Sequence, residues 1–114
     1  MPAIDLKQQA GDLLDAARGA SSGRASHLLV GGPESVMTQT VIALSAGAAL
    51  GEHLNPGQAT LWVLEGEVEL VAGDERVTAQ AGDLVEIPPS RHSLEAGTDA
   101  VLVLTAVKLG EHTG

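Results

Sequence analysis

The sequence contains no cysteine, which excludes disulfide bonds and thiolate metal sites. Phenylalanine and tyrosine are also absent, and Trp62 is the single tryptophan. The core is therefore expected to be aliphatic, and surfaces that stack bases or sugar rings are reduced to one side chain. No segment approaches the roughly 18 consecutive apolar residues of a membrane-spanning helix. We therefore expect no membrane partner.

Basic residues are few, since 6 lysines and arginines stand against 15 aspartates and glutamates, giving a formal net charge of −9. Binding to phosphate backbones requires clustered lysine or arginine, so we expect no nucleic-acid partner. The N-terminus shows no apolar signal segment, and together with the missing cysteine this predicts a cytoplasmic protein. A length of 114 residues predicts one domain with a single modest core.

The N-terminal part has a helical pattern. Apolar side chains in residues 3–18 recur near helical spacing, which predicts a short amphipathic helix that ends near Gly19. Residues 20–25 are rich in serine and glycine and read as a connector. The helix is expected to pack on its own domain or on a second copy of the chain.

From His27 onward the pattern is that of β-structure. Short runs rich in β-branched residues alternate with breaks that contain glycine, which favours a sandwich, jelly roll or barrel. The expected strands are residues 27–30, 36–45, 60–64, 67–72, 77–79, 84–87, 92–96 and 100–107.

Two segments carry a distinctive spacing. In residues 47–66 a glycine is followed by His53, by Asn55 two positions later, by a Pro-Gly turn and by a strand that ends in Glu-Gly. In residues 82–92 a glycine is followed after five residues by Pro88 and, after a short turn, by His92. In this order the two segments resemble the paired motifs of the cupins, and the resemblance spans residues 36–107.

The resemblance implies an all-β fold, a double-stranded β-helix (jelly-roll or cupin barrel) with a short N-terminal α-helix. It divides the chain into an N-terminal helix and connector (1–25), the cupin barrel (26–110) and a C-terminal tail (111–114). It also implies a homodimer.

The first motif departs from the family pattern. Cupins usually supply two histidines and one glutamate from it to a metal, whereas here His53 remains, Asn55 occupies the place of the second histidine and Ala59 that of the glutamate. The second motif is one residue shorter than usual between Pro88 and His92. The resemblance therefore implies an inward cluster of two imidazoles and one amide.

Strand geometry supports the same cluster. Residues two apart in a strand face the same way, so His53 and Asn55 can point together into a barrel. By the same rule one face of the following strand is aliphatic (Ala59, Leu61, Val63) and Trp62 lies on the other, where it is expected to pack between sheets or against a dimer mate. His92 shares its side of a strand with Leu94 and Ala96, while His27 and His112 are expected at the surface.

Three functions remain open at this point. The first is binding of a compact metabolite in an apolar barrel pocket by His53, Asn55, Gln58 and His92. The second is a metal-dependent enzyme of dioxygenase or isomerase type, in which His53 and His92, with Asn55 as a weaker third ligand, hold a divalent Zn, Ni, Fe or Cu ion. The third is a structural or regulatory module that dimerises through its edge strands and Trp62. The sequence does not decide whether the protein is an enzyme.

Overall fold

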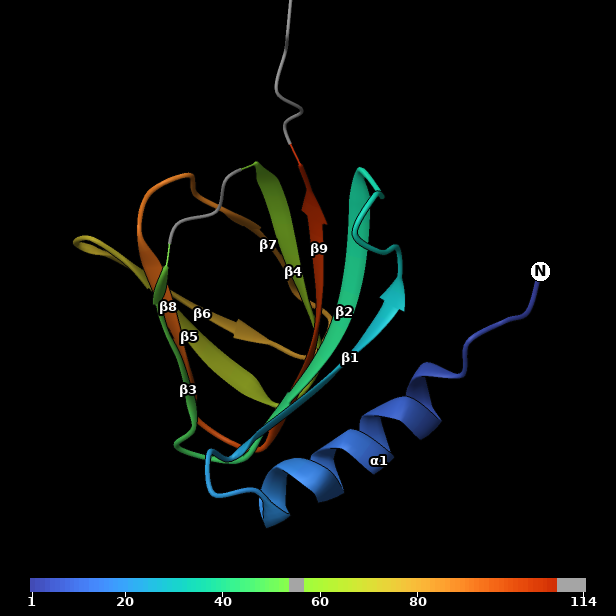
Figure 1. Cartoon of the computed structure of the whole chain (residues 1–114). Coiled ribbons are helices and arrows are strands. Elements are labelled where there is room, and N and C mark those ends of the chain that lie inside the picture. The colour runs from blue at the N-terminus through green and yellow to red at the C-terminus, as the bar shows by residue number, and fades with distance from the viewer. Residues whose placement is uncertain (54–56, 109–114) are drawn as a thin grey trace, which may run out of the picture.

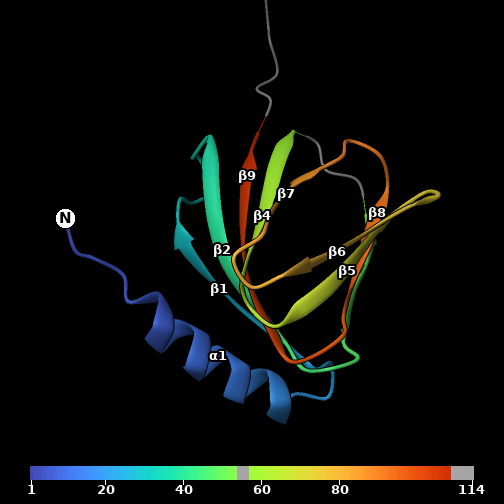
Figure 2. The ribbon, with the colours of Figure 1, turned by 180° about the vertical axis from the view of Figure 1, so that it is seen from behind.

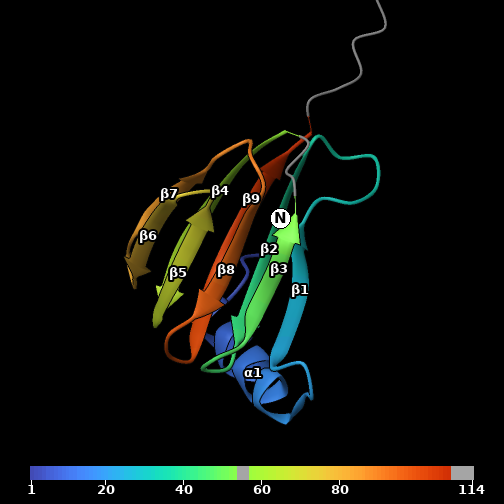
Figure 3. The same cartoon turned by 90° about the vertical axis from the view of Figure 1, so that its left-hand side faces the viewer.

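The computed structural model describes residues 1–53 and 57–108, which form one helix and nine strands (Figure 1). The elements are α1 (Leu6–Gly19), β1 (Arg24–Val30), β2 (Met37–Leu44), β3 (Ala49–His53), β4 (Gln58–Glu65), β5 (Glu67–Ala72), β6 (Glu75–Gln80), β7 (Leu84–Ile87), β8 (His92–Ala96) and β9 (Ala100–Val107). They build two antiparallel sheets in the orders β1-β2-β9-β4-β7 and β3-β8-β5-β6. Figure 3 shows the two sheets facing each other, so the expected jelly-roll barrel with an N-terminal helix is confirmed.

Asp5 caps the N-terminus of the helix. The Asp5 carboxylate accepts hydrogen bonds from the backbone N–H groups of Lys7 (3.1 Å) and Gln8 (3.2 Å), two donors that have no partner within the helix. The helix then runs to Gly19, as its periodicity predicts.

Two strand predictions need correction. The connector expected at residues 20–25 is shorter, because β1 already begins at Arg24 and pairs in register with β2 from Arg24 opposite Leu44. The strand β3 was not among those expected, since glycines flank and interrupt it. Its pairing with β8, a tertiary contact that local propensity does not encode, makes it a strand.

Among the described residues the space between the sheets is filled mainly by aliphatic side chains, as the missing aromatic residues predict. The buried members of this interior are Ile42, Leu44, Ala59, Leu61, Val63, Val68, Leu70, Ala79, Ile87, Leu94, Ala96, Ala100 and Leu102. Four of them are alanines, so the sheets approach closely where these residues meet.

The helix α1 covers the outer face of the larger sheet near β1 and β2 (Figure 2). Its buried residues Ala10, Leu14 and Ala17 form a second cluster with Val41, Ala43 and Val101 of the sheet. The helix therefore packs on its own domain, and small alanine side chains bring its backbone close to the strands. Among the described residues no helix is long and apolar enough to cross a membrane.

Trp62 does not lie between the sheets. The inward alternation of Ala59, Leu61 and Val63 places it on the outer face of β4, where it is 42% exposed beside Leu84, its cross-strand partner on β7, which is 67% exposed.

One end of the barrel is joined to the helix by Asp99, in the turn before β9. Its Oδ1 accepts a hydrogen bond from the Ala46 backbone N–H (2.9 Å), and its Oδ2 accepts from Arg18 Nε (2.9 Å) and pairs with Arg18 Nη2 (2.8 Å). The Ala46 N–H, and after it the Arg18 guanidinium, lower the pKa of the Asp99 carboxyl. One carboxylate thus connects α1, the β2–β3 turn and the β8–β9 turn.

Substitution of Asp99 by Asn should lower the urea midpoint of unfolding at neutral pH, because the ion pair with Arg18 is lost. A carboxyl with a lowered folded-state pKa stabilises the fold above its unfolded pKa of about 3.9, and this contribution disappears as the pH falls through the folded-state value. The difference between wild type and D99N should therefore shrink toward zero as the pH falls below the folded-state pKa of Asp99.

Asp15 provides the matched control. It also pairs with Arg18, at 3.3 Å, but its side chain is 80% exposed, so D15N should leave the midpoint almost unchanged. A D99N difference as large in acid as at neutral pH would show that the carboxylate charge is not what stabilises this end.

The same end contains a close backbone approach at Gly66, between β4 and β5. Gly66 has φ +80°, and an added Cβ would overlap the Asp99 carbonyl oxygen and lie 2.8 Å from Thr98 Oγ1 and 2.9 Å from Ala100 Cα. We expect Gly66→Ala to destabilise the fold by about 3 kcal/mol or more, measured by urea unfolding.

Gly73, in the β5–β6 hairpin, separates backbone strain from steric overlap as the cause of that loss. It has φ +60° but no atom within 4 Å of a built Cβ, so Gly73→Ala should cost only the backbone strain of about 1 kcal/mol. Equal losses for both variants would refute steric overlap as the reason for Gly66.

Candidate functional site

His92 is the buried polar side chain of the interior. It lies at the start of β8, is 3% exposed, and shares its face of the strand with the buried Leu94 and Ala96, as the alternation predicts. Its Nδ1 lies 3.0 Å from the carbonyl oxygen of Ser90. Because a carbonyl oxygen only accepts hydrogen bonds, Nδ1 is the donor in this contact.

A small cavity adjoins this ring. It measures about 30 Å³ and is lined by His92 together with seven aliphatic residues, namely Ile42, Leu50, Leu61, Leu70, Ile87, Leu94 and Leu104. This volume accommodates about one water molecule, whereas pockets for small molecules measure about 300–1,000 Å³. A metabolite therefore does not fit inside the barrel as it stands.

The first motif is only partly described. The backbone of His53, the last residue of β3, is the register partner of His92, after an irregularity in the pairing that follows Leu50. Asn55 lies outside the described residues. The motifs are therefore brought together at the level of the backbone, with the two histidine positions opposite each other.

Ala59 faces inward as expected. It is 5% exposed, belongs to the interior cluster and pairs with Ile87 on β7, so a methyl group occupies the wall where the family pattern has a carboxylate. Gln58 precedes it on β4 and is exposed. The two residues line a hollow of about 470 Å³ at the rim of the barrel, together with Gly57, Glu86, Ile87, Pro88 and Pro89.

The described residues do not fit the metal centre that the family pattern implies. Among residues 1–53 and 57–108 no group of three or more histidine, aspartate or glutamate side chains is placed to hold a metal ion. The cavity beside His92 offers one imidazole among hydrocarbon walls, whereas stable metal sites usually have three or more protein ligands.

Sequence reasoning missed a second hollow, which lies between β1 and β3 and contains Arg24. Its residues come from three separate segments of the chain, so no local sequence motif predicts it.

The comparisons with known proteins agree with this architecture. A family model described as "Cupin domain" matches residues 40–108. No curated protein of similar sequence was found.

Several solved structures share the fold. A conserved protein of unknown function from Streptococcus pyogenes is 24% identical, with a TM-score of 0.79 and coverage of 96% of this chain and 90% of that one. An RmlC-like cupin from Shewanella frigidimarina is 23% identical, with a TM-score of 0.68 and coverage of 80% and 81%. A variant of salicylate 1,2-dioxygenase from Pseudoaminobacter salicylatoxidans is 19% identical, with a TM-score of 0.74; the match covers 90% of this chain but 32% of the dioxygenase.

At these identities the structural neighbours establish the fold alone, and function rests on the site. The family model, by contrast, covers more than half of the sequence and includes both motifs, from β2 to the end of β9. The chain belongs to the cupin domain family.

Proposed function

We propose that this cupin binds a compact polar metabolite at the rim of its barrel, above His92. The observation that carries the proposal is the buried and oriented imidazole of His92 in an otherwise aliphatic interior. A buried polar group needs its hydrogen bonds, and His92 has one at Nδ1 to the Ser90 carbonyl oxygen, so its ring is held in a fixed orientation. A ring held in this way is suited to orienting a ligand.

The rim hollow provides the space that the interior lacks. Its volume of about 470 Å³ lies in the range of small-molecule sites, and it shares Ile87 with the cavity beside His92. The Gln58 amide and the Glu86 carboxylate contribute polar groups at the rim. In this proposal Gln58, His53 and Asn55 hold the polar edge of the ligand, and its apolar part contacts Ala59 and Ile87.

The alternative is a metal-dependent enzyme of dioxygenase or isomerase type, with His53 and His92 as ligands of a Zn, Ni, Fe or Cu ion. Two observations favour it as the second candidate. The backbone register puts His53 opposite His92, and a metal-binding histidine commonly donates its other ring N–H to a carbonyl, as His92 Nδ1 does to Ser90. Such a metal would supply Lewis acidity.

The homodimer implied by the family resemblance is also a proposal. It is supported by the apolar pair Trp62 and Leu84, which lies exposed on the outer face of the larger sheet.

The proposed function predicts that His92→Leu abolishes ligand binding while the chain still folds, because leucine suits the aliphatic cavity. A panel of compact hydroxy, amino and keto metabolites would be screened by ligand-observed NMR against protein purified without an affinity tag. We expect the dissociation constant of each hit to rise at least tenfold in H92L, about 1.4 kcal/mol. His27→Leu is the matched control, since His27 is exposed on β1.

Metal analysis of the same preparation separates the two candidates. Under the binding proposal the purified protein holds well below one metal ion per chain. H92L then loses metabolite binding, and its metal content stays as low as that of wild type. Stoichiometric metal that disappears in both His53→Ala and His92→Ala would overturn the metal-free pocket. Hits that bind equally well to H92L would overturn the role of His92.

The aliphatic wall at Ala59 makes a further prediction. Ala59→Glu restores a carboxylate where the family pattern has its metal-binding glutamate, so under the metal alternative its affinity for Zn should rise at least tenfold over wild type, measured by calorimetry. The metal-free variant should be destabilised by about 2 kcal/mol or more, because the carboxylate replaces a buried methyl group. Thr60→Glu carries the same charge on the other face of β4; equal Zn affinity in both variants would contradict the inward placement.

A further inference from the structure

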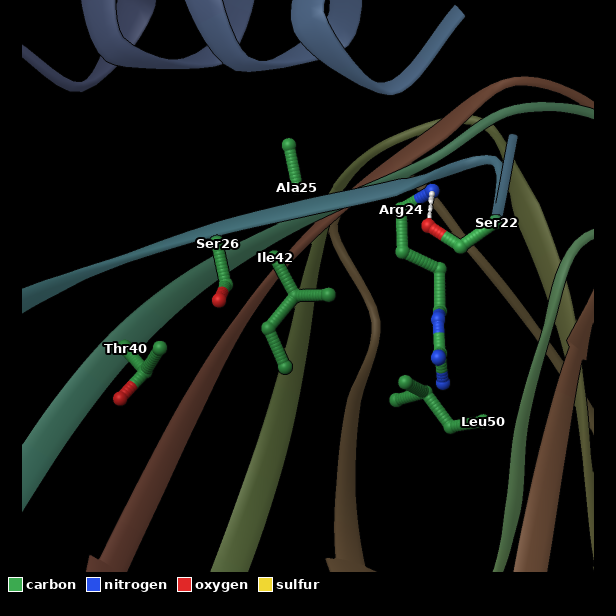
Figure 4. Close-up of a pocket in the computed structure, with 7 residues that line it drawn as sticks. All are labelled: Ser22, Arg24, Ala25, Ser26, Thr40, Ile42 and Leu50. Carbon is green, nitrogen blue, oxygen red and sulfur yellow. Dashed lines mark hydrogen bonds between the residues drawn. The ribbon is translucent and has the colours of Figure 1, made fainter. Parts of the chain in front are cut away.

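The second hollow is a groove on the open side of the barrel, where the two sheets present their edge strands β1 and β3. It measures about 440 Å³, which lies in the range of small-molecule sites. Seven residues line it: Ser22, Arg24, Ala25, Ser26, Thr40, Ile42 and Leu50 (Figure 4).

The charge of this groove is opposite to that of the molecule. The chain carries 15 acidic residues and a net charge of −9, yet none of the seven lining residues is acidic and one is Arg24. An anion that approaches here meets a cation without a neighbouring carboxylate in the lining. Long-range repulsion from the acidic chain is screened within about 10 Å at moderate salt, so the local cation decides binding.

The Arg24 guanidinium has N–H donors available for a ligand. Arg18 and Arg76 each pair with carboxylates at 2.8 Å. Within the described part of the chain Arg24 has no such ion pair, and its guanidinium makes one long contact, from Nη1 to the Ala49 carbonyl oxygen at 3.5 Å. A guanidinium has five N–H donors in a planar fork that matches a carboxylate.

The rest of the groove is amphipathic. Figure 4 shows the Arg24 side chain extending from β1 toward Leu50 of β3, with Ile42 beside it and Ser26 and Thr40 on the far side of Ile42. Ile42 and Leu50 also line the cavity beside His92. These two side chains therefore form the floor of the groove and one wall of the internal cavity.

We propose that the groove binds a small aliphatic monocarboxylate. The carboxylate pairs with the Arg24 guanidinium, and the hydrocarbon chain lies on Leu50 and Ile42, toward Ser26 and Thr40. This site is separate from the rim hollow of the proposed function, because the two share no lining residue.

Hexanoate is the probe for the test, added to the full chain at neutral pH and about 0.1 M salt and followed in ¹H–¹⁵N NMR spectra. We expect saturable shifts of the Arg24, Ser26 and Leu50 amides, and no comparable shifts with hexanol, which lacks the charge. Arg24→Gln should weaken hexanoate binding at least tenfold. Arg76→Gln removes the same charge from the β5–β6 hairpin and should have no effect on binding.

Three outcomes would overturn the proposal: no saturable shifts, equal binding by R24Q, or shifts that map to the rim hollow instead. A fourth would be a dimer in sedimentation that Ser26→Trp converts to a monomer, which would make the groove an interface between copies. His92→Leu should leave hexanoate binding unchanged, so that failure here is distinguishable from failure of the rim site.

Discussion

The structure depends on one packing constraint, which is that a barrel without phenylalanine or tyrosine must be filled by alanine, valine, leucine and isoleucine. These side chains pack densely between the sheets and leave little internal volume. The cavity of about 30 Å³ beside His92 is the result. Space for ligands is found instead at the rim and between the edge strands β1 and β3. The absence of large side chains therefore moves the candidate sites from the centre of the barrel to its borders.

At the end of the barrel near the helix, hydrogen bonds join segments that are distant in the sequence. Near the helix, Asp99 bonds to Arg18 and to the Ala46 N–H, and Gly66 lets two turns approach closely. Backbone hydrogen bonds also join the Gly47 N–H to the Ala96 carbonyl and the Gly97 N–H to the Glu67 carbonyl, each at 2.9 Å. The opposite end carries the β7–β8 loop and His92. The fold is kept although Ala59 stands where the family pattern has a glutamate.

Patterns that repeat along a strand were readable from the sequence. Alternation predicted that Ala59, Leu61 and Val63 face inward and that His92 lies with Leu94 and Ala96, and these placements are confirmed. Contacts between distant segments were not readable. The strand β3 depends on β8, Asp99 bonds to an arginine 81 positions earlier, and the groove around Arg24 is assembled from three segments. Trp62 is expected to pack between the sheets or against a dimer mate; the register of β4 leaves it on the outer face, which excludes the first of these and leaves the second a proposal.

The position of β9 affects how the chain reaches this structure. It is the middle strand of the larger sheet, paired with β2 on one side and β4 on the other, yet it is made after every other strand of both sheets. While the ribosome is still synthesising it, β2 and β4 have no partner on their facing edges, and the α1 cluster lacks Val101. Exposed strand edges favour pairing with other chains. The larger sheet therefore cannot close until β9 is available to pair with both β2 and β4.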